Sequence, residues 1–181
     1  VDERWSQFLA KRQKTIDPIV KLAKDMKLDD TNFERIGVHA AREQDGGRKN
    51  CTRTDNVFKR AEADLHNLVP SIGEVNGDRN NFSFGWLPAQ SGQYGSCLTQ
   101  VDFKAKKVMP RPSIRGMIAR TYFYMSKQYG LRLSKQDRQL YEAWNRTYPV
   151  LPWERQRNQT VACVMGRGNE FVGPVNLKAC G

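Results

Sequence analysis

The sequence has few of the residues that most often build metal and redox sites. It contains two histidines, and its four cysteines form no C-x-x-C pair, which argues against a zinc site or a thioredoxin-type motif. No apolar run approaches the length that crosses a bilayer, so we expect no membrane partner. The first ten residues also lack the apolar core of a signal peptide, so an exported form would be a mature or trimmed one.

Acidic residues are also scarce relative to basic ones. The 181 residues include 30 Lys and Arg against 19 Asp and Glu, which gives a net charge of +11. Such a balance is typical of proteins that bind nucleic acid. Basic proteins also bind anionic membranes or simply remain in solution, so charge alone leaves the partner open. The length suits one domain with a sizeable core, and we predict a single domain over residues 1–181.

The cysteines stand far apart in the chain, at Cys51, Cys97, Cys163 and Cys180. An even, scattered count is typical of disulfides and of an oxidising compartment. The alternative is a cytosolic protein with four buried thiols.

Hydrophobic spacing predicts a mostly helical chain with one strand, and we assign an α+β fold with a small antiparallel sheet. Two short helices are expected within residues 1–27, the second beginning at Asp17-Pro18, followed by a helix over 57–68 that Pro70 ends. A short helix carrying Asn76 and a strand over 97–104 come next. The last two expected helices are one over 113–129, which Gly130 ends, and one that begins at Ser134 and Asp137. We expect the last two helices to pack antiparallel and residues 153–181 to be loop-like. Arg115, Arg120, Lys127 and Arg132 could follow phosphates, but we expect most of them to be solvated.

One stretch, residues 62–81, gathers chemically active groups. It reads E-A-D-L-H-N-L-V-P-S-I-G-E-V-N-G-D-R-N-N, so apolar residues that can anchor it in a core alternate with carboxylates, carboxamides and a histidine. Imidazole can take a proton from water near neutral pH, and carboxamide or carboxylate oxygens are natural ligands of a hard divalent cation. The pattern therefore predicts a hydrolytic or metal site.

These residues, with several other motifs, resemble the bacterial endonuclease I family of periplasmic and secreted nucleases. The shared motifs cover about three quarters of the chain: G-G-R-K-N-C at 46–51, the stretch 62–81, Q-Y-G-S-C at 93–97, V-D-F-K at 101–104, R-G-M-I-A-R-T-Y-F-Y-M at 115–125 and A-W-N-R-T-Y-P-V-L-P-W-E at 143–154. Residues 1–40 differ from the family and are expected to form a divergent helical segment.

The resemblance implies a ββα-metal motif that hydrolyses phosphodiester bonds of DNA, or of RNA, without sequence preference. It implies catalytic roles for His39, Arg48 and Glu62, with Mg²⁺, or Ca²⁺ or Mn²⁺, on Asn76. It also implies phosphate contacts from Arg48, Lys49 and Arg79. A monomer in the periplasm or outside the cell is expected, with disulfides that pair Cys51 with Cys97 and Cys163 with Cys180.

The family's E-H-V-V-P motif, whose glutamate binds the metal and whose histidine is the general base, has no full counterpart. A loose alignment places His39 on the histidine and Val38 on the glutamate. His66 is the other candidate base, although the family keeps its equivalent beside a separate catalytic histidine. Glu34, Glu43 and Asp64 are the acidic residues that could replace the missing ligand.

The alternative function, favoured by these departures, is a protein of the same fold that binds nucleic acid without cutting it. A more remote alternative is an interaction partner or inhibitor that has no role with nucleic acid.

Overall fold

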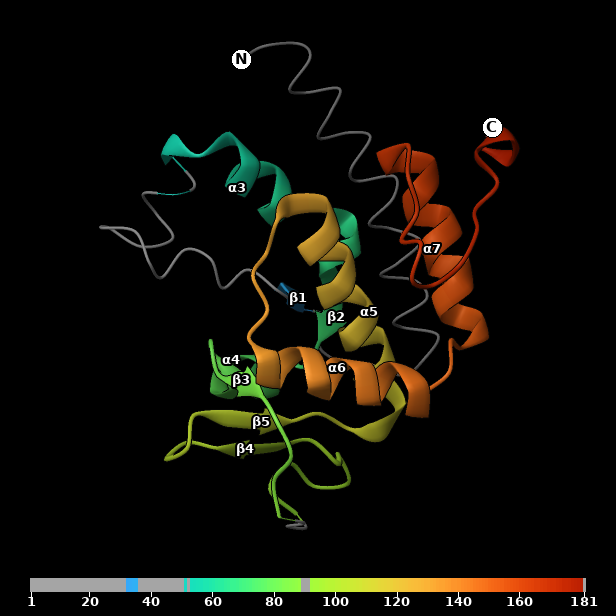
Figure 1. Ribbon diagram of the computed structural model, residues 1–181. Helices are drawn as coiled ribbons and strands as arrows, with labels where there is room; N and C mark the ends of the chain where they lie inside the picture. Colours follow the sequence, from blue (N-terminus) through green and yellow to red (C-terminus); the bar gives the residue numbers. More distant parts are fainter. Residues whose placement is uncertain (1–31, 36–50, 52, 89–91, 181) are drawn as a thin grey trace.

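The computed structural model describes residues 51, 53–88 and 92–180, together with the backbone of 32–35 (Figure 1). The predicted helices within 1–27 therefore lie outside the described residues. The strands are β1 (Asn32–Arg35), β2 (Leu68–Ser71), β3 (Ser83–Phe84), β4 (Gln100–Asp102) and β5 (Lys107–Met109). The helices are α3 (Asn56–Glu62), α4 (Gly73–Arg79), α5 (Pro112–Tyr129), α6 (Lys135–Thr147) and α7 (Pro152–Met165), with short 3₁₀ turns η2 (Leu65–Asn67) and η3 (Leu177–Ala179).

The predicted α+β class is confirmed, with helices dominating and two small sheets. β1 pairs antiparallel with β2, and the second sheet has the order β3-β5-β4. That sheet is not purely antiparallel as predicted, because β3 runs parallel to β5 while β4 runs antiparallel to it. β5, the last of these three strands in the chain, takes the central position between β3 and β4. Its Val108 is buried there.

The main core forms where α5 and α6 pack against the second sheet. Its largest members are aromatic: Tyr122 and Tyr141 stack with ring centroids 4.5 Å apart, and Trp144 is fully buried beside Phe84. Such rings bury large apolar areas and contribute most of the hydrophobic stabilisation of a domain this size.

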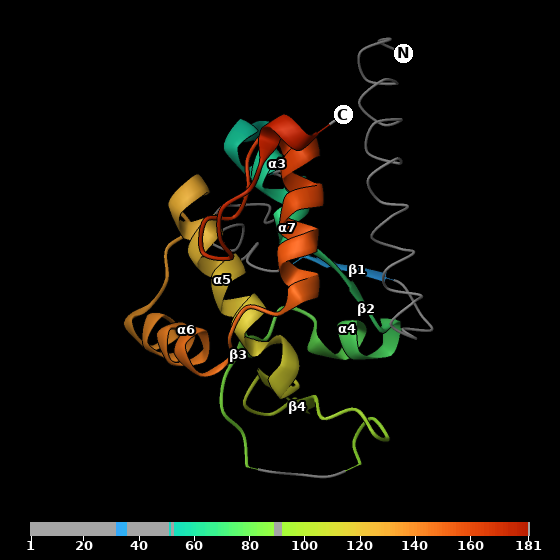
Figure 2. The same ribbon diagram turned by 90° about the vertical axis from the view of Figure 1, so that its right-hand side faces the viewer.

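The bounds of α5 and α6 follow their sequence signals closely. Gly130 ends α5 in the left-handed region at a φ of 70°, a conformation that glycine adopts without steric cost. Ser134 caps α6 by accepting a hydrogen bond from the Asp137 amide at 3.0 Å. The two helices do not form the expected antiparallel pair, because α6 crosses α5 steeply in both views (Figures 1 and 2). Leu131 and Leu133 of the connection between them pack against the core.

Two other predictions are wrong. The helix predicted over 57–68 ends at Glu62, because Asp64 turns the chain into η2, and Pro70 lies within β2, paired with Phe33. The segment predicted to be loop-like contains the 14-residue helix α7. Its inward face carries Glu154, Arg157 and Asn158, whose polarity concealed the helical pattern.

Only one of the two expected disulfides is present. Cys163 on α7 is bonded to Cys180, which fastens the C-terminal segment to that helix. No disulfide joins Cys51 to Cys97, which corrects the pairing that the family likeness implied. Cys51 packs on Phe58 of α3, whereas Cys97 precedes β4, and these two elements lie at opposite ends of the molecule in both views (Figures 1 and 2).

A buried ion pair ties the three long helices together. Arg120 of α5 donates from Nε and Nη2 to the two carboxylate oxygens of Glu154 on α7, each at 2.7 Å. Its Nη1 donates to Asn145 of α6 and to the Tyr148 carbonyl oxygen. Arg120 is 2% exposed, so it is not the solvated side chain that we expected, and Arg115 is buried as well.

Gly116 makes this arrangement possible. A Cβ at that position would lie 2.3 Å from the Tyr148 carbonyl oxygen and 2.7 Å from the Arg120 guanidinium. The absence of a side chain therefore lets the α6–α7 connection approach α5 closely enough for Arg120 to reach it.

We predict that Arg120→Ala lowers the free energy of unfolding by about 3–5 kcal/mol, because it leaves the Glu154 carboxylate buried without its partner. Lys127→Ala is the matched control, since its salt bridge to Glu170 is exposed on both sides and should contribute less than about 1 kcal/mol. Urea denaturation measures both. Equal stability of the two variants would contradict the role assigned to the buried pair.

Candidate active site

The stretch singled out in the sequence folds into a compact unit of two strands and a helix. β1 pairs antiparallel with β2 in a register that places Asn32 opposite Ser71 and Arg35 opposite Leu68. After one residue, Ile72, the chain enters α4, which contacts β1 (Figure 2). We call β1, β2 and α4 the ββα unit. The unit has the order of elements that the ββα-metal resemblance implied.

Asn76 lies in the middle of α4 and is partly exposed. The Asn76 amide donates to the Ile72 carbonyl oxygen and its carbonyl accepts from the Asn80 amide, so its backbone is satisfied by the helix. No described residue forms a hydrogen bond with its carboxamide. A carboxamide oxygen presented by a helix in this way can accept a hydrogen bond or ligate a hard cation.

Two side chains of α4 fix the helix, one against the loop between β3 and β4 and one against β3. Asp78 accepts a hydrogen bond of 2.9 Å from the Tyr94 hydroxyl; burial, followed by this bond, raises the pKa of Tyr94 and keeps the hydroxyl protonated. The Arg79 guanidinium lies over the Phe84 ring, 4.8 Å from its centroid.

Arg79 is 6% exposed, so the structure gives this arginine a packing role at the end of α4. The phosphate contact expected of Arg79 does not fit that burial.

The fully buried carboxylate of Asp64 fixes the backbone just before β2. Its Oδ1 accepts the His66 amide at 2.8 Å, and its Oδ2 accepts from the hydroxyls of Tyr124 and Tyr129 and from Nη2 of Arg167. Arg167 also donates to both tyrosine hydroxyls. We call these four side chains, Asp64, Tyr124, Tyr129 and Arg167, the Asp64 cluster. Because both Asp64 oxygens are engaged and buried, Asp64 is unsuited to replace a metal ligand.

His66 is built into the same region as a structural residue. It is 1% exposed, its Nε2 is 3.0 Å from the Arg167 carbonyl oxygen, and its ring lies against Tyr124. Burial lowers the pKa of His66 to about 4, so the imidazole is neutral at physiological pH. A general base must reach a water molecule at the substrate, which the buried position of His66 prevents.

Arg157 of α7 fixes the other side of the same segment. Its Nη2 donates to the carbonyl oxygens of Leu65 and Leu68 at 2.7 and 2.6 Å. Burial lowers the pKa of Arg157 to about 10, which still leaves the guanidinium charged at neutral pH. One buried cation therefore satisfies carbonyl groups at the point where η2 passes into β2, and it sets the direction in which the ββα unit leaves the core.

The remaining predicted site residues are not brought to Asn76 by the described structure. His39, Arg48 and Lys49, as well as Glu43, lie outside the described residues. Glu62 ends α3, and α3 and α4 lie at opposite ends of β2 in both views (Figures 1 and 2). Among the described side chains, no group of three His, Cys, Asp or Glu could hold a metal ion.

Sequence reasoning missed the residues that position the site. The positioning role of Asp64 has a local signal. An aspartate side chain often accepts a hydrogen bond from the backbone amide two residues later, here that of His66, and so starts a turn. Arg157 and Arg167 carry none, since their partners are 92 and 103 residues away in the chain.

Comparison with known proteins identifies relatives over most of the chain. A family model described as Endonuclease I matches residues 39–175. An extracellular endonuclease of Pseudomonas fluorescens biotype A is 97% identical over 90 residues, which cover 50% of this chain and 39% of that protein. An extracellular deoxyribonuclease of Aeromonas hydrophila is 54% identical over 130 residues, covering 71% of this chain and 56% of its own.

A periplasmic deoxyribonuclease of the same organism is 49% identical over 130 residues, covering 71% of this chain and 54% of its own length. The chain spans about half the length of the curated relatives it matches.

We predict that His66 makes stability depend on pH below neutrality. Its pKa is about 4 in the folded protein against 6.5 for the ordinary group, so the unfolded chain takes up the proton first. The stability is fully present above pH 6.5 and falls by about 3 kcal/mol as the pH drops to 4. His66→Gln should lose this part of the slope, because it cannot titrate. Chemical denaturation between pH 4 and 7.5 checks it, and parallel curves for the two proteins would contradict it.

Proposed function

The chain belongs to the endonuclease I family, whose model matches residues 39–175, and we propose that it is a metal-dependent endonuclease that hydrolyses phosphodiester bonds of DNA without sequence preference. The names of its relatives, extracellular endonuclease and extracellular and periplasmic deoxyribonuclease, support this reaction and substrate. The net charge of +11 supports binding to the phosphate backbone, to which contacts need no base readout.

The observation that carries the proposal is the position of Asn76. It stands on the helix of the ββα unit with a carboxamide that no described residue engages, while its neighbours Asp78 and Arg79 are held by Tyr94 and Phe84. A side chain left available on a helix that is otherwise fixed is suited to a ligand.

A hard divalent cation fits this donor. The carboxamide oxygen of Asn76 is a ligand type that Mg²⁺ and Ca²⁺ accept, and a carboxylate from a second element would be needed beside it. Glu34 is our candidate for that carboxylate. It lies on β1, the strand that α4 contacts, at the register position opposite Val69, whereas Asp64 is committed to its cluster. When bound, such a cation neutralises charge on the phosphate and its leaving oxygen.

The chain's own side chains would do the rest of the chemistry. His39, just before the G-G-R-K-N-C motif, would take the proton from the attacking water, since the buried His66 is excluded from that role. Arg48 would hold the phosphate with its forked donors, and Lys49 would hold the neighbouring phosphate as a point charge.

The place of action that we propose is outside the cytoplasm, in the periplasm or the medium. Two relatives are named extracellular and one periplasmic, and the Cys163–Cys180 disulfide suits an oxidising compartment. We propose a monomer. Within the described residues, no helix combines the length and the apolar content that crossing a membrane requires.

Nicking of supercoiled plasmid over a Mg²⁺ titration tests this function. We expect His39→Ala to lower the rate about 100-fold or more at every concentration, because it removes the general base. Asn76→Ala and Glu34→Gln should instead shift the Mg²⁺ dependence to higher concentration. Asn56→Ala, an exposed asparagine at the start of α3, is the matched control.

Full activity of His39→Ala would overturn the assignment of the base. A wild-type protein that binds DNA but does not nick it at any metal concentration would favour the alternative, a protein that binds nucleic acid without cutting it.

We also predict that Arg48→Ala lowers the nicking rate about 100-fold without lowering the melting temperature, because the guanidinium would stabilise charge on the phosphate. Arg146→Ala, which removes an exposed arginine from α6, should leave both unchanged. A drop in melting temperature with unchanged nicking would assign Arg48 a structural role instead.

A further inference from the structure

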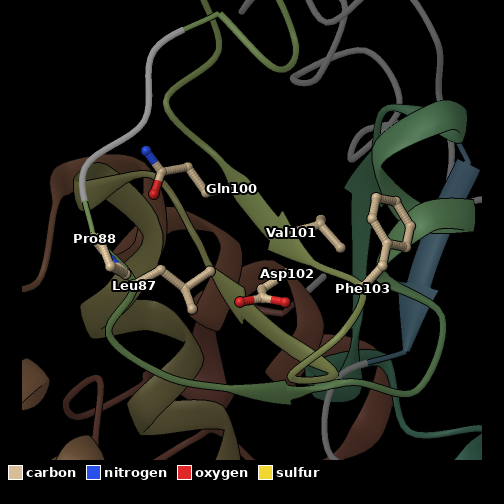
Figure 3. Close-up of a pocket in the computed structure, with 6 residues that line it drawn as sticks. All are labelled: Leu87, Pro88, Gln100, Val101, Asp102 and Phe103. Carbon is tan, nitrogen blue, oxygen red and sulfur yellow. The ribbon is translucent and has the colours of Figure 1, made fainter.

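The V-D-F-K motif at 101–104 has no part in the proposed reaction, yet it borders a pocket. The cavity has a volume of about 220 Å³ and lies beside β4 (Figure 3). It is lined by Leu87, Pro88, Gln100, Val101, Asp102 and Phe103. A space smaller than a typical drug-sized site, lined by both polar and apolar groups, can hold one small flat ring.

Phe103 presents an aromatic surface at this pocket. Phe103 is 55% exposed. One side is fixed by an edge contact with Phe82, with ring centroids 6.2 Å apart. The Phe82 amide donates to the Arg79 carbonyl oxygen at the end of α4, so the aromatic surface is joined directly to the helix that carries Asn76.

A turn with three lysines adjoins Phe103. Lys104 and Lys106 lie between β4 and β5, and Lys107 is the first residue of β5. All three are exposed, and none forms an ion pair with a described residue. The turn is held in shape because Asp102 Oδ1 accepts the Ala105 amide at 2.7 Å and the Lys106 carbonyl accepts the Ser83 amide. Three neighbouring cations on a fixed turn repel one another, and an anionic partner relieves that repulsion.

The outer edge of β4 argues against a peptide as that partner. Gln93 already occupies the hydrogen-bonding groups of Val101: its Nε2 donates to the carbonyl oxygen at 3.0 Å, and its Oε1 accepts from the amide at 2.8 Å. An added strand would need those same groups. The occupant must therefore be recognised by stacking and by charge.

We propose that this pocket receives one unpaired nucleobase of a DNA strand, with Phe103 stacked on the base and Lys104, Lys106 and Lys107 on the flanking phosphates. The proposal rests on the proposed function, because it assigns a second contact of the same substrate. Asp102 lies in the middle of the pocket lining in Figure 3. A carboxylate there accepts hydrogen bonds from an exocyclic amino group, which favours cytosine or adenine over thymine.

Binding is tested in EDTA, where metal-dependent cleavage is absent, by fluorescence anisotropy with labelled single-stranded and duplex oligonucleotides. Base stacking predicts that Phe103→Ala weakens binding to single strands about 10-fold, with little effect on duplex. Phe103→Trp should restore it. Leu98→Ala, which removes another exposed apolar side chain near β4, is the control.

The role of the lysines is tested with the double variant Lys104→Gln/Lys106→Gln. The control is the double variant Lys59→Gln/Lys178→Gln, which removes the same charge from α3 and η3. The first pair should lower the slope of log affinity against log salt by about 1.4 for single strands, and the control should not.

The base preference is tested with homopolymers of deoxycytidine and thymidine. The wild type should favour the cytosine strand several-fold. Asp102→Asn should lose that preference, because its amide can also donate to the thymine O4 while still accepting from Ala105.

The proposal is overturned if Phe103→Ala binds single strands as tightly as the wild type, if the two lysine pairs behave alike, or if the wild type does not bind single strands in EDTA. The proposed function is tested by plasmid nicking in Mg²⁺, which is a separate measurement from binding in EDTA. A wild type that shows the predicted binding effects but does not nick refutes the proposed function alone.

Discussion

The ββα unit depends on the Asp64 carboxylate being satisfied inside the protein. An ionised carboxylate is costly to bury without partners, and Asp64 is fully buried. Its partners come from α5, from the end of that helix and from the segment after α7. Two distant parts of the chain, α5 and the segment after α7, must therefore be in place before η2 can enter the core, and only then does β2 start in its observed direction.

Two buried arginines, Arg157 and Arg120, complete the same arrangement. Arg157 satisfies carbonyl groups at the start of β2, and Arg120 joins α5 to α7 through Glu154. Asn169 adds a link by donating to the Arg120 carbonyl oxygen while its own amide bonds Asn158 of α7. A buried ion pair does not by itself make a protein more stable than apolar packing would. Its directional hydrogen bonds do select one arrangement of helices, and that selection orients α4 and Asn76.

The limits of sequence reasoning here follow from the distance between interacting residues. The ends of α5 and α6 were predictable because Gly130 and Ser134 act on adjacent backbone. The place of Asn76 on a short helix was predictable for the same local reason. Helix α7 was not, because residues typical of surfaces, Glu154 and Arg157, face inward to partners far away in the chain. Burial of Arg120 and Arg79 likewise depends on Glu154 and Phe84, which no local pattern reveals.

The bond between Cys163 and Cys180 joins residues 17 positions apart and closes a loop that includes Arg167 and Asn169. Several residues near its end, from Asn176 to Ala179, are exposed, and exposed segments of this kind are where proteases cut. A cut there would break the chain without releasing the fragment, because the disulfide would still join the two pieces. Arg167 would then remain beside Asp64. In the proposed place of action outside the cytoplasm, the protein would in this way tolerate one cleavage within this loop.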